Sequence, residues 1–144
     1  MPDKTYRRIK GSSGKGLEKF LGELQLAVME IVWNHQSVNV SDVLNILNQQ
    51  QRNLAYTTVM TIMSRLAEKG WLIPEKRGRA YFYQAARSRE DAEAEAVGEV
   101  VRGLLEDFGE LAIAQFVKEL DEIDPNHLSR LAELAREVEQ NDEQ

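Results

Sequence analysis

The side chains best suited to chemistry lie on one side of a helix predicted over residues 55–69. This face carries hydroxyl groups and one thioether with no charge at its centre: Tyr56, Thr57, Met60, Thr61 and Ser64. A solvated helix face normally carries Glu and Lys, whereas Thr lowers helix propensity. Threonine hydroxyls can hydrogen-bond base edges or phosphates, and the threonine methyl can contact the thymine methyl. The pattern therefore favours a surface that reads nucleic acid over a face that is rich in threonine by chance.

A basic turn follows this helix and is suited to phosphate contacts. Two β-prone runs, residues 71–73 and 80–83, flank a segment that contains Pro74 and Gly78, which predicts a hairpin. The tip carries Lys76, Arg77 and Arg79. Cations at a hairpin tip can reach the phosphate backbone beside the groove that a neighbouring helix occupies.

Residues for catalysis or metal binding are scarce. The absence of cysteine excludes disulfides, thiol catalysis and thiolate metal sites, and His35 and His127 are the only histidines. The many carboxylates of the second half fall at solvated helix positions and form no acid and base pair. Residues 11–16 contain glycines, but their spacing does not match a phosphate loop and no apolar strand precedes them. We expect no enzyme, no cofactor and no metal.

Three predicted helices position the hydroxyl-rich face. The first spans residues 21–35, the second runs through Leu47, residues 48–53 form a polar turn, and the third spans 55–69. The third helix packs on the other two through an apolar stripe, which consists of Val59, Ile62, Met63 and Leu66. Three helices followed by a basic hairpin are the order of a winged helix-turn-helix.

Helix ends are indicated by capping residues. Ser41 and Ser88 are expected to cap the helices that follow them, and Asp124 is expected to cap a helix whose first position is a proline. Gly70 suits the left-handed position after a helix. His35 can satisfy terminal carbonyls, a role that we favour over metal binding.

The net charge of −6 hides an uneven distribution. Residues 1–86 contain 12 Lys and Arg against 7 Asp and Glu, a net charge of +5. Residues 87–144 contain 6 against 17, a net charge of −11. A phosphate polyanion attracts the first half and repels the second, which fits a DNA-reading module joined to a partner-binding module; a chance distribution of solvating charge is the alternative.

The second half predicts three short amphipathic helices, separated near Gly109 and Asp124. Three such helices in fewer than 60 residues bury too little apolar surface to be stable alone, so we expect two chains to share one core. Docking of the helices onto the winged helix of the same chain is the alternative. The expected dimer contacts are Val101, Leu104, Leu105, Phe108, Phe116, Leu120, Leu128, Leu131 and Leu134.

Three segments of the chain carry a family resemblance. Residues 21–33, 54–61 and 79–83 resemble the penicillinase repressor family of the BlaI/MecI/CopY type, and the likeness extends from about Leu21 to Val138. The resemblance implies a homodimer with an N-terminal winged helix and a C-terminal dimerisation region, which represses genes by binding an inverted-repeat operator.

Two departures from the family pattern limit what the resemblance implies. The copper-responsive branch carries a cysteine cluster near its C-terminus, and this chain has no cysteine, which excludes copper sensing through that site. In the antibiotic-responsive branch a sensor protease triggers cleavage at an Asn-Phe bond, and the matching position here is Gln115-Phe116. Inactivation by a protease or another signal protein therefore stays open.

We expect a mainly α fold with a small β wing: a flexible basic tail over residues 1–20, a winged helix-turn-helix DNA-binding domain over 21–86 and a helical, three-helix dimerisation region over 87–144. The tail either follows phosphates or is inert. Helix 55–69 would enter the major groove and wing 74–81 would lie on the phosphate backbone. The expected DNA contacts are Tyr56, Thr57, Thr58, Met60, Thr61, Arg65, Arg77, Arg79 and Tyr81.

The alternative function is a winged helix that binds a protein partner through the same helix face without reading DNA. No apolar run approaches the roughly 18 to 20 residues that a membrane span requires, and the N-terminus lacks the apolar core of a secretory signal. We therefore expect a cytoplasmic protein without a membrane partner.

Overall fold

A computed structural model describes residues 16–142 and divides the chain into two compact units, the first ending at Val97 and the second beginning at Gly98. The first unit contains α1 (Glu18–Leu21), α2 (Glu23–Trp33), α3 (Val40–Gln49) and α4 (Tyr56–Glu68), the strands β1 (Leu72–Arg77) and β2 (Ala80–Ala85), and the start of α5 (Arg89–Phe108). The second contains the rest of α5, α6 (Glu110–Ile123) and α7 (Asn126–Asp142). The expected fold class, mainly α with a small β wing, is confirmed.

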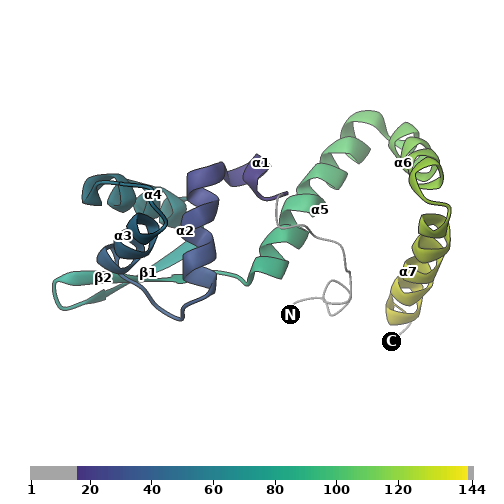
Figure 1. Cartoon of the computed structure of the whole chain (residues 1–144). Helices are drawn as coiled ribbons and strands as arrows, with labels where there is room; N and C mark the ends of the chain where they lie inside the picture. The colour runs from purple at the N-terminus through teal and green to yellow at the C-terminus, as the bar shows by residue number, and fades with distance from the viewer. Residues whose placement is uncertain (1–15, 143–144) are drawn as a thin grey trace. The chain divides into compact units, whose positions relative to one another are not determined.

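The core of the first unit lies where α2, α3 and α4 meet. Figure 1 shows α3 and α4 on one side of α2, with the β1–β2 hairpin beside them. The most deeply buried side chains come from all three helices: Met29, Leu47, Met63, Leu66, Val28, Val32, Val43 and Val59. The apolar stripe predicted for the third helix is therefore the face that packs, with only Ile62 partly exposed.

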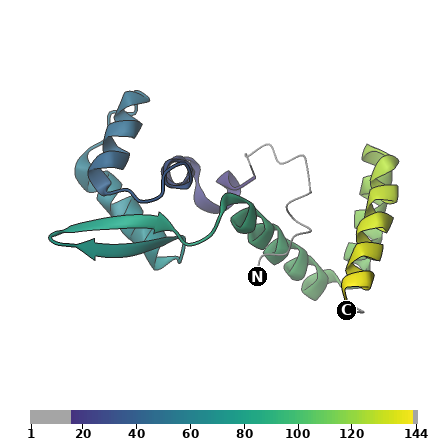
Figure 2. The same ribbon diagram turned by 90° about the horizontal axis from the view of Figure 1, so that it is seen from below.

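The hairpin is joined to this core through a third short segment. Val38 pairs with Tyr83 of β2, and the backbone N–H of each donates to the carbonyl of the other, at 3.0 and 2.7 Å. Leu72 and Tyr83 are buried at the base of the hairpin, whereas its tip projects beyond the helices in both ribbon views (Figures 1 and 2). Strand β1 extends through Pro74 to Arg77, a segment that the sequence placed in the turn.

The first helix is interrupted where the sequence predicted continuity. Gly22 has a φ of +80°, which separates α1 from α2. Leu17 and Leu21 pack into the core, so residues 16–20 are not part of a flexible tail, contrary to the expectation; residues 1–15 lie outside the described residues. The interval of four residues places both leucines on one side of a helical turn, a signal too short to stand out from a basic, glycine-rich segment.

Most of the predicted helix ends are confirmed. Gly70 adopts a φ of +83° in a Schellman motif that closes α4, with Trp71 N–H bonded to Leu66 O at 2.9 Å. The Ser88 hydroxyl accepts from Asp91 N–H, and the Asp124 carboxylate accepts from Asn126 N–H.

The predicted cap of α3 is wrong. Asn39, rather than Ser41, is the N-cap: its side chain accepts from Asp42 N–H at 2.8 Å, and the Asp42 carboxylate accepts from Asn39 N–H at 3.1 Å. The helix begins two residues earlier than a cap at Ser41 would allow, because Val40 packs into the core. Asn39 and Asp42 together form a capping box.

No helix within residues 16–142 combines the length and apolarity that a membrane crossing requires.

The capping box predicts a difference between two neighbouring substitutions. Asn39→Ala removes the acceptor for Asp42 N–H and should lower the free energy of unfolding by about 1 kcal/mol. Ser41→Ala should change it by less than about 0.5 kcal/mol, since Ser41 is exposed and caps nothing. Urea unfolding of the full chain at one fixed protein concentration measures both, and an equal loss for the two variants would contradict the assignment of the cap.

Candidate nucleic-acid interface

The hydroxyl-rich side of α4 faces solvent. Its residues Tyr56, Thr57, Met60, Thr61 and Ser64, which we call the reading face, are all exposed, as the sequence predicted. Thr61 Oγ1 donates to Thr57 O at 2.9 Å, so its hydrogen is used within the helix. Its oxygen lone pairs and its methyl group remain available to an outside partner. Thr58 and Arg65, the other predicted contacts on α4, are exposed as well.

The start of α4 is open. Its N-cap is Ala55, which has no side-chain acceptor, and the first turn contains no acidic residue. Within residues 16–142, the backbone N–H groups of Tyr56 and Thr57 have no acceptor. Unpaired N–H groups and the positive end of the helix dipole both favour an anion at this position. Sequence reasoning missed this feature, although an alanine in the N-cap position was its signal.

Hydrogen bonds from a side chain of α3 hold the turn before α4 in place. Gln51 and Asn53 have φ of 64° and 53°, in the left-handed region that non-glycine residues rarely adopt. The Asn48 side chain holds both polar groups of the Leu54 backbone: Leu54 N–H donates to Asn48 Oδ1 at 2.7 Å, and Asn48 Nδ2 donates to Leu54 O at 3.3 Å. These bonds fix the position from which α4 starts.

An ion pair holds the same turn to α2. Both terminal nitrogens of Arg52 donate to the Glu23 carboxylate, with Nη1 and Oε2 3.0 Å apart. The hydrogen bonds from Arg52 lower the pKa of Glu23 from its ordinary value, and those to Glu23 raise the pKa of Arg52. Arg52 is thus paired with Glu23 at the protein surface, so this arginine of the turn positions α4 rather than presenting an unpaired charge.

The register of the hairpin decides which wing residues share a face. The pairs Leu72–Ala85, Pro74–Tyr83 and Lys76–Tyr81 alternate with Ile73–Gln84, Glu75–Phe82 and Arg77–Ala80. Side chains directly opposite each other in an antiparallel pair lie on one face. Lys76 and Tyr81 therefore continue the face that buries Leu72 and Tyr83, whereas Arg77 points to the opposite face.

Arg77 is engaged within the hairpin. Its guanidinium lies 4.7 Å from the centroid of the Phe82 ring, and Nη2 is 3.1 Å from Glu75 Oε2. Lys76, Arg79 and Arg65 have no ion-pair partner within the described part of the chain. The sequence predicted Arg77, Arg79 and Tyr81 as contacts of the wing. In the folded hairpin Arg77 lies on the opposite face from Tyr81, whereas Lys76 lies on the same face as Tyr81.

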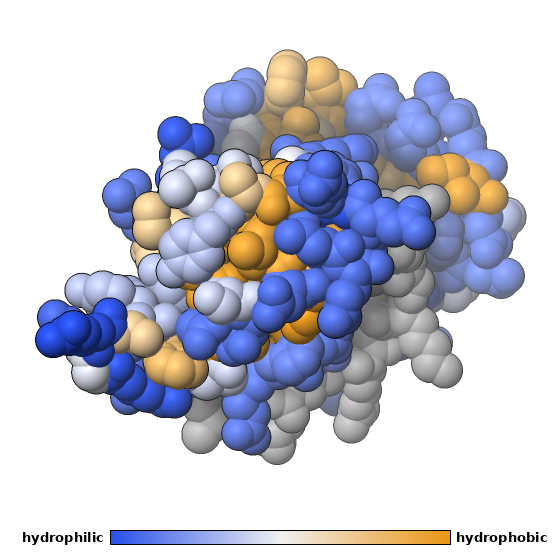
Figure 3. Space-filling model, turned by 60° about the vertical axis from the view of Figure 1, so that its left-hand side comes forward, coloured by the Kyte–Doolittle hydropathy of each residue, from blue (hydrophilic) through white to orange (hydrophobic). Residues whose placement is uncertain are grey.

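The turn at the tip has two residues, with Gly78 at a φ of +63°. A glycine with positive φ at the first central position is typical of a tight hairpin turn of type II′. In Figure 3, strongly hydrophilic atoms gather at the end of the projecting lobe at the left. The tip is therefore a compact carrier of cationic side chains.

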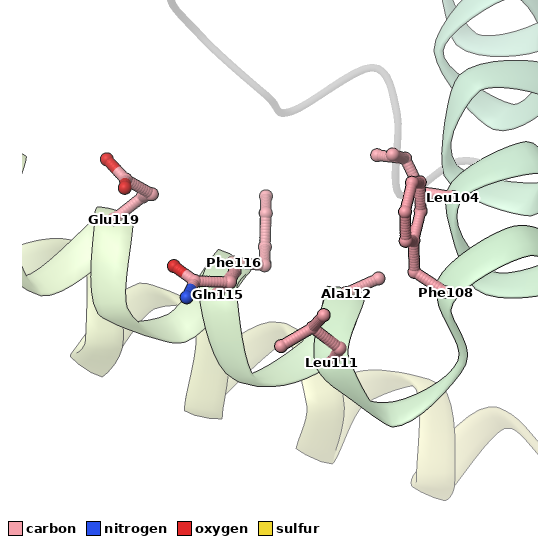
Figure 4. Close-up of a pocket in the computed structure, with 7 residues that line it drawn as sticks. All are labelled: Leu104, Phe108, Leu111, Ala112, Gln115, Phe116 and Glu119. Carbon is pink, nitrogen blue, oxygen red and sulfur yellow. The ribbon is translucent and has the colours of Figure 1, made fainter.

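The predicted dimer contacts fall into two groups. Val101, Leu104, Leu105, Phe108 and Phe116 are exposed on α5 and α6, whereas Leu120, Leu128, Leu131 and Leu134 are partly shielded where α6 and α7 pack together. A groove with a volume of about 300 Å³ lies between the end of α5 and α6. In Figure 4, Leu104 and Phe108 face this groove from α5, opposite Ala112 and Phe116 of α6.

Similar proteins include transcription regulators. Residues 21–137 match the family described as penicillinase repressor. The transcriptional regulator BlaI of Mycobacterium tuberculosis is 34% identical over 119 residues, which cover 79% of this chain and 84% of that protein. The penicillinase repressor of Bacillus licheniformis is 32% identical over 63 residues, 44% of this chain and 48% of the relative. The solution structure of the DNA-binding domain of the repressor BlaI covers 46% of this chain and 80% of that domain, with 31% identity and a TM-score of 0.42.

The pair between Arg52 and Glu23 predicts a pH-dependent contribution to stability. The folded pKa of Glu23 is lower than its ordinary value of 4.5, so the stabilisation is present above that value and is lost as pH falls through the folded pKa. Glu23→Gln should lower the urea midpoint at pH 7, and the gap from the parent chain should close in acid. Glu68→Gln, at an exposed position of α4, is the matched control. A gap that stays constant with pH would contradict the assignment.

Proposed function

Because the chain belongs to the penicillinase repressor family, we propose that it represses transcription by binding an inverted-repeat operator as a homodimer. The observation that carries this proposal is the reading face, which is uncharged, rich in hydroxyls and exposed on a helix with an open N-terminus. Catalysis is not part of the function, since the family consists of repressors.

Helix α4 enters the major groove in this proposal. The groove is about 12 Å wide and accepts one helix, with side chains of its first turns nearest the base edges. Thr57, Met60 and Thr61 lie nearest the bases, and Tyr56, Thr58 and Arg65 contact the flanking backbone. The unpaired N–H groups of Tyr56 and Thr57 support a phosphate contact at the start of α4.

The wing, residues 74–81, lies on the phosphate backbone beside the groove. Lys76 and Arg79 have no ion-pair partner among residues 16–142, and Tyr81 offers a hydroxyl on the same face of the hairpin as Lys76. Arg77 contributes less than its charge suggests, since a phosphate must compete with Glu75 for its guanidinium. Cations that contact phosphates add affinity on every sequence, whereas the reading face selects among sequences.

The homodimer forms through the second unit. α6 and α7 bury no residue fully, and large apolar side chains on α5 and α6 stay exposed, among them Phe108 at 58% and Phe116 at 57%. A contiguous exposed apolar surface on a small helical unit marks an association site. Two copies of the winged helix would then read half-sites about 34 Å apart, one helical turn of DNA.

Relief of repression by a protease at Gln115-Phe116 remains a proposal of its own. Both residues lie within α6, whereas proteolytic nicking prefers exposed loop tips. Cleavage at this bond therefore requires α6 to unwind first. A signal that loosens α6 would also relieve repression.

The alternative, a winged helix that binds a protein partner through Tyr56 and Met60, makes a different prediction about salt. Binding to mixed genomic duplex DNA should weaken steeply as salt rises if phosphates are contacted. DNA binding that is absent, or insensitive to salt, would favour the protein-binding alternative. Selection of bound duplexes from a random pool, followed by sequencing, then tests for an inverted repeat and gives the operator sequence.

Substitutions on the reading face and on the wing should have different effects. Thr61→Ala should change base preference at particular positions of the selected operator, by about 1 to 3 kcal/mol. Thr61→Val, which keeps the methyl, should retain any preference for thymine. Arg79→Ala should weaken all sequences similarly and reduce the salt slope by about 1. Fluorescence anisotropy over a salt series measures both, and base-specific effects from Arg79→Ala would contradict the assignment of the wing.

The apolar groove predicts which substitution separates the dimer. Phe108→Asp places a charge among Leu104, Leu111 and Phe116, and sedimentation analysis should find a monomer with at least about tenfold weaker operator binding. Ala132→Asp, at an exposed position of α7, adds the same charge outside the groove and should leave the dimer intact. A Phe108→Asp chain that still sediments as a dimer would place the interface elsewhere.

A further inference from the structure

A group of contacts fastens the beginning of α5 to α2, all of it within the first unit. Trp33 Nε1 donates to Arg87 O at 2.9 Å, and Arg89 Nη2 lies 2.9 Å from Glu30 Oε1. The Arg89 guanidinium also lies 5.8 Å from the centre of the Trp33 ring. We call Glu30, Trp33, Arg87 and Arg89 the junction.

The first turns of α5 carry further bonds that hold the junction arginines in place. Arg89 Nε lies 3.1 Å from Glu93 Oε1, and Arg87 pairs with Glu95. Each arginine is therefore held by α5 itself, while Arg89 also reaches Glu30 and the ring of Trp33 on α2. A planar guanidinium can bond in its plane and stack on its face at once, which a lysine cannot do.

Small residues bring α5 close to the rest of the first unit. Ala92 and Ala96, one helical turn apart, are 3% and 7% exposed, and Ala96 belongs to the core that includes Leu17 and Leu21. α5 is thus held over two turns by packing on one face and by the junction at its start. Its direction where it leaves the winged helix is set by these contacts.

Stability alone is a weak explanation for the junction. The side chains of Arg89 and Glu30 are 35% and 42% exposed, and ion pairs at such positions contribute little to folding. Two glutamates and a tryptophan converging on one arginine instead restrict its geometry. A restriction of geometry matters where a helix joins a reading module to a module that holds a second copy.

We propose that the junction determines which half-site spacing the dimer accepts, with Arg89 as its central positioning residue. The proposal rests on the proposed function, since spacing has meaning only for a dimer on an inverted repeat. Each base pair inserted between half-sites moves the second one by about 3.4 Å and turns it by about 35°. A winged helix whose orientation is fixed at the start of α5 cannot follow this change, whereas a winged helix that rotates freely can.

The spacing test uses the inverted repeat recovered from the random pool, rebuilt with its half-sites one or two base pairs closer or farther apart. The parent chain should lose about tenfold in affinity on the altered duplexes. The Arg89→Ala variant should bind the original repeat less tightly than the parent chain does. Its affinity should differ by less than about threefold between the original and the altered spacings. Glu30→Gln keeps the shape of Glu30 and should reduce part of the dependence of affinity on spacing. This second variant tests the proposal even if the Arg89→Ala chain folds poorly.

A second measurement does not depend on DNA. Because the chain has no cysteine, Asn45→Cys at an exposed position of α3 places one spin label on each chain of a dimer. Pulsed electron spin resonance on the full chain should give a narrow label-to-label distance distribution in the parent and a broader one in Arg89→Ala. Arg136→Ala, on exposed α7 outside the junction, is the matched control and should leave the distribution narrow.

The outcomes separate this inference from the function on which it rests. A dimer whose spacing profile and distance distribution are unchanged by both junction variants overturns the junction as a spacing determinant and leaves the repressor function standing. A chain that sediments as a monomer, or a pool that yields no inverted repeat, overturns both proposals. A junction variant that loses affinity equally at every spacing shows a role in stability alone and overturns the inference.

Discussion

The arrangement of the reading module depends on the burial of one side of α4. Val59, Met63 and Leu66 are inaccessible to solvent against α2 and α3, and a rotation of α4 about its axis would expose them. Since a helix has a fixed angular relation between its faces, burying this stripe turns the reading face outward. The bonds from Asn48 to Leu54 and from Arg52 to Glu23 fix where α4 begins. The core sets the rotation of the helix, and the braced turn sets its position.

Ion pairs within the protein decide which cationic side chains are available to a polyanion. Arg52, Arg77 and Arg89 each have a carboxylate partner within the protein, so their formal charges overstate what they offer outside. Arg65, Lys76 and Arg79 have no such partner in the described part of the chain. A count of basic residues therefore locates the basic half correctly but does not show which cations already have a carboxylate partner within the protein. Pairing therefore separates the arginines that hold elements of the protein together from those that are proposed to contact phosphate.

The second unit has the opposite surface chemistry, acidic with large apolar side chains left exposed. Acidic side chains keep a helical surface in solution and away from phosphate, while the apolar side chains of α5 and α6 need a partner. Several of these apolar side chains, Phe108 and Phe116 among them, line one groove. In the proposed dimer, affinity for an inverted repeat would depend on both units, because each winged helix alone would contact only one half-site.

The sequence alone determined the fold class, the helix that carries the reading face and the division of charge between the halves, because periodicity and composition are local properties of the chain. It misplaced the cap of α3 and the status of Leu17, since burial of Val40 and of Leu17 depends on segments distant in the sequence. The strand register was likewise undetermined: a shift of one residue exchanges the faces, so only the folded hairpin could separate Arg77 from Lys76 and Tyr81. The contacts between Trp33 and Arg87 and between Glu30 and Arg89 span more than fifty residues, and no local pattern announces such pairs. Tertiary structure decided them because packing brings distant polar groups within hydrogen-bonding distance.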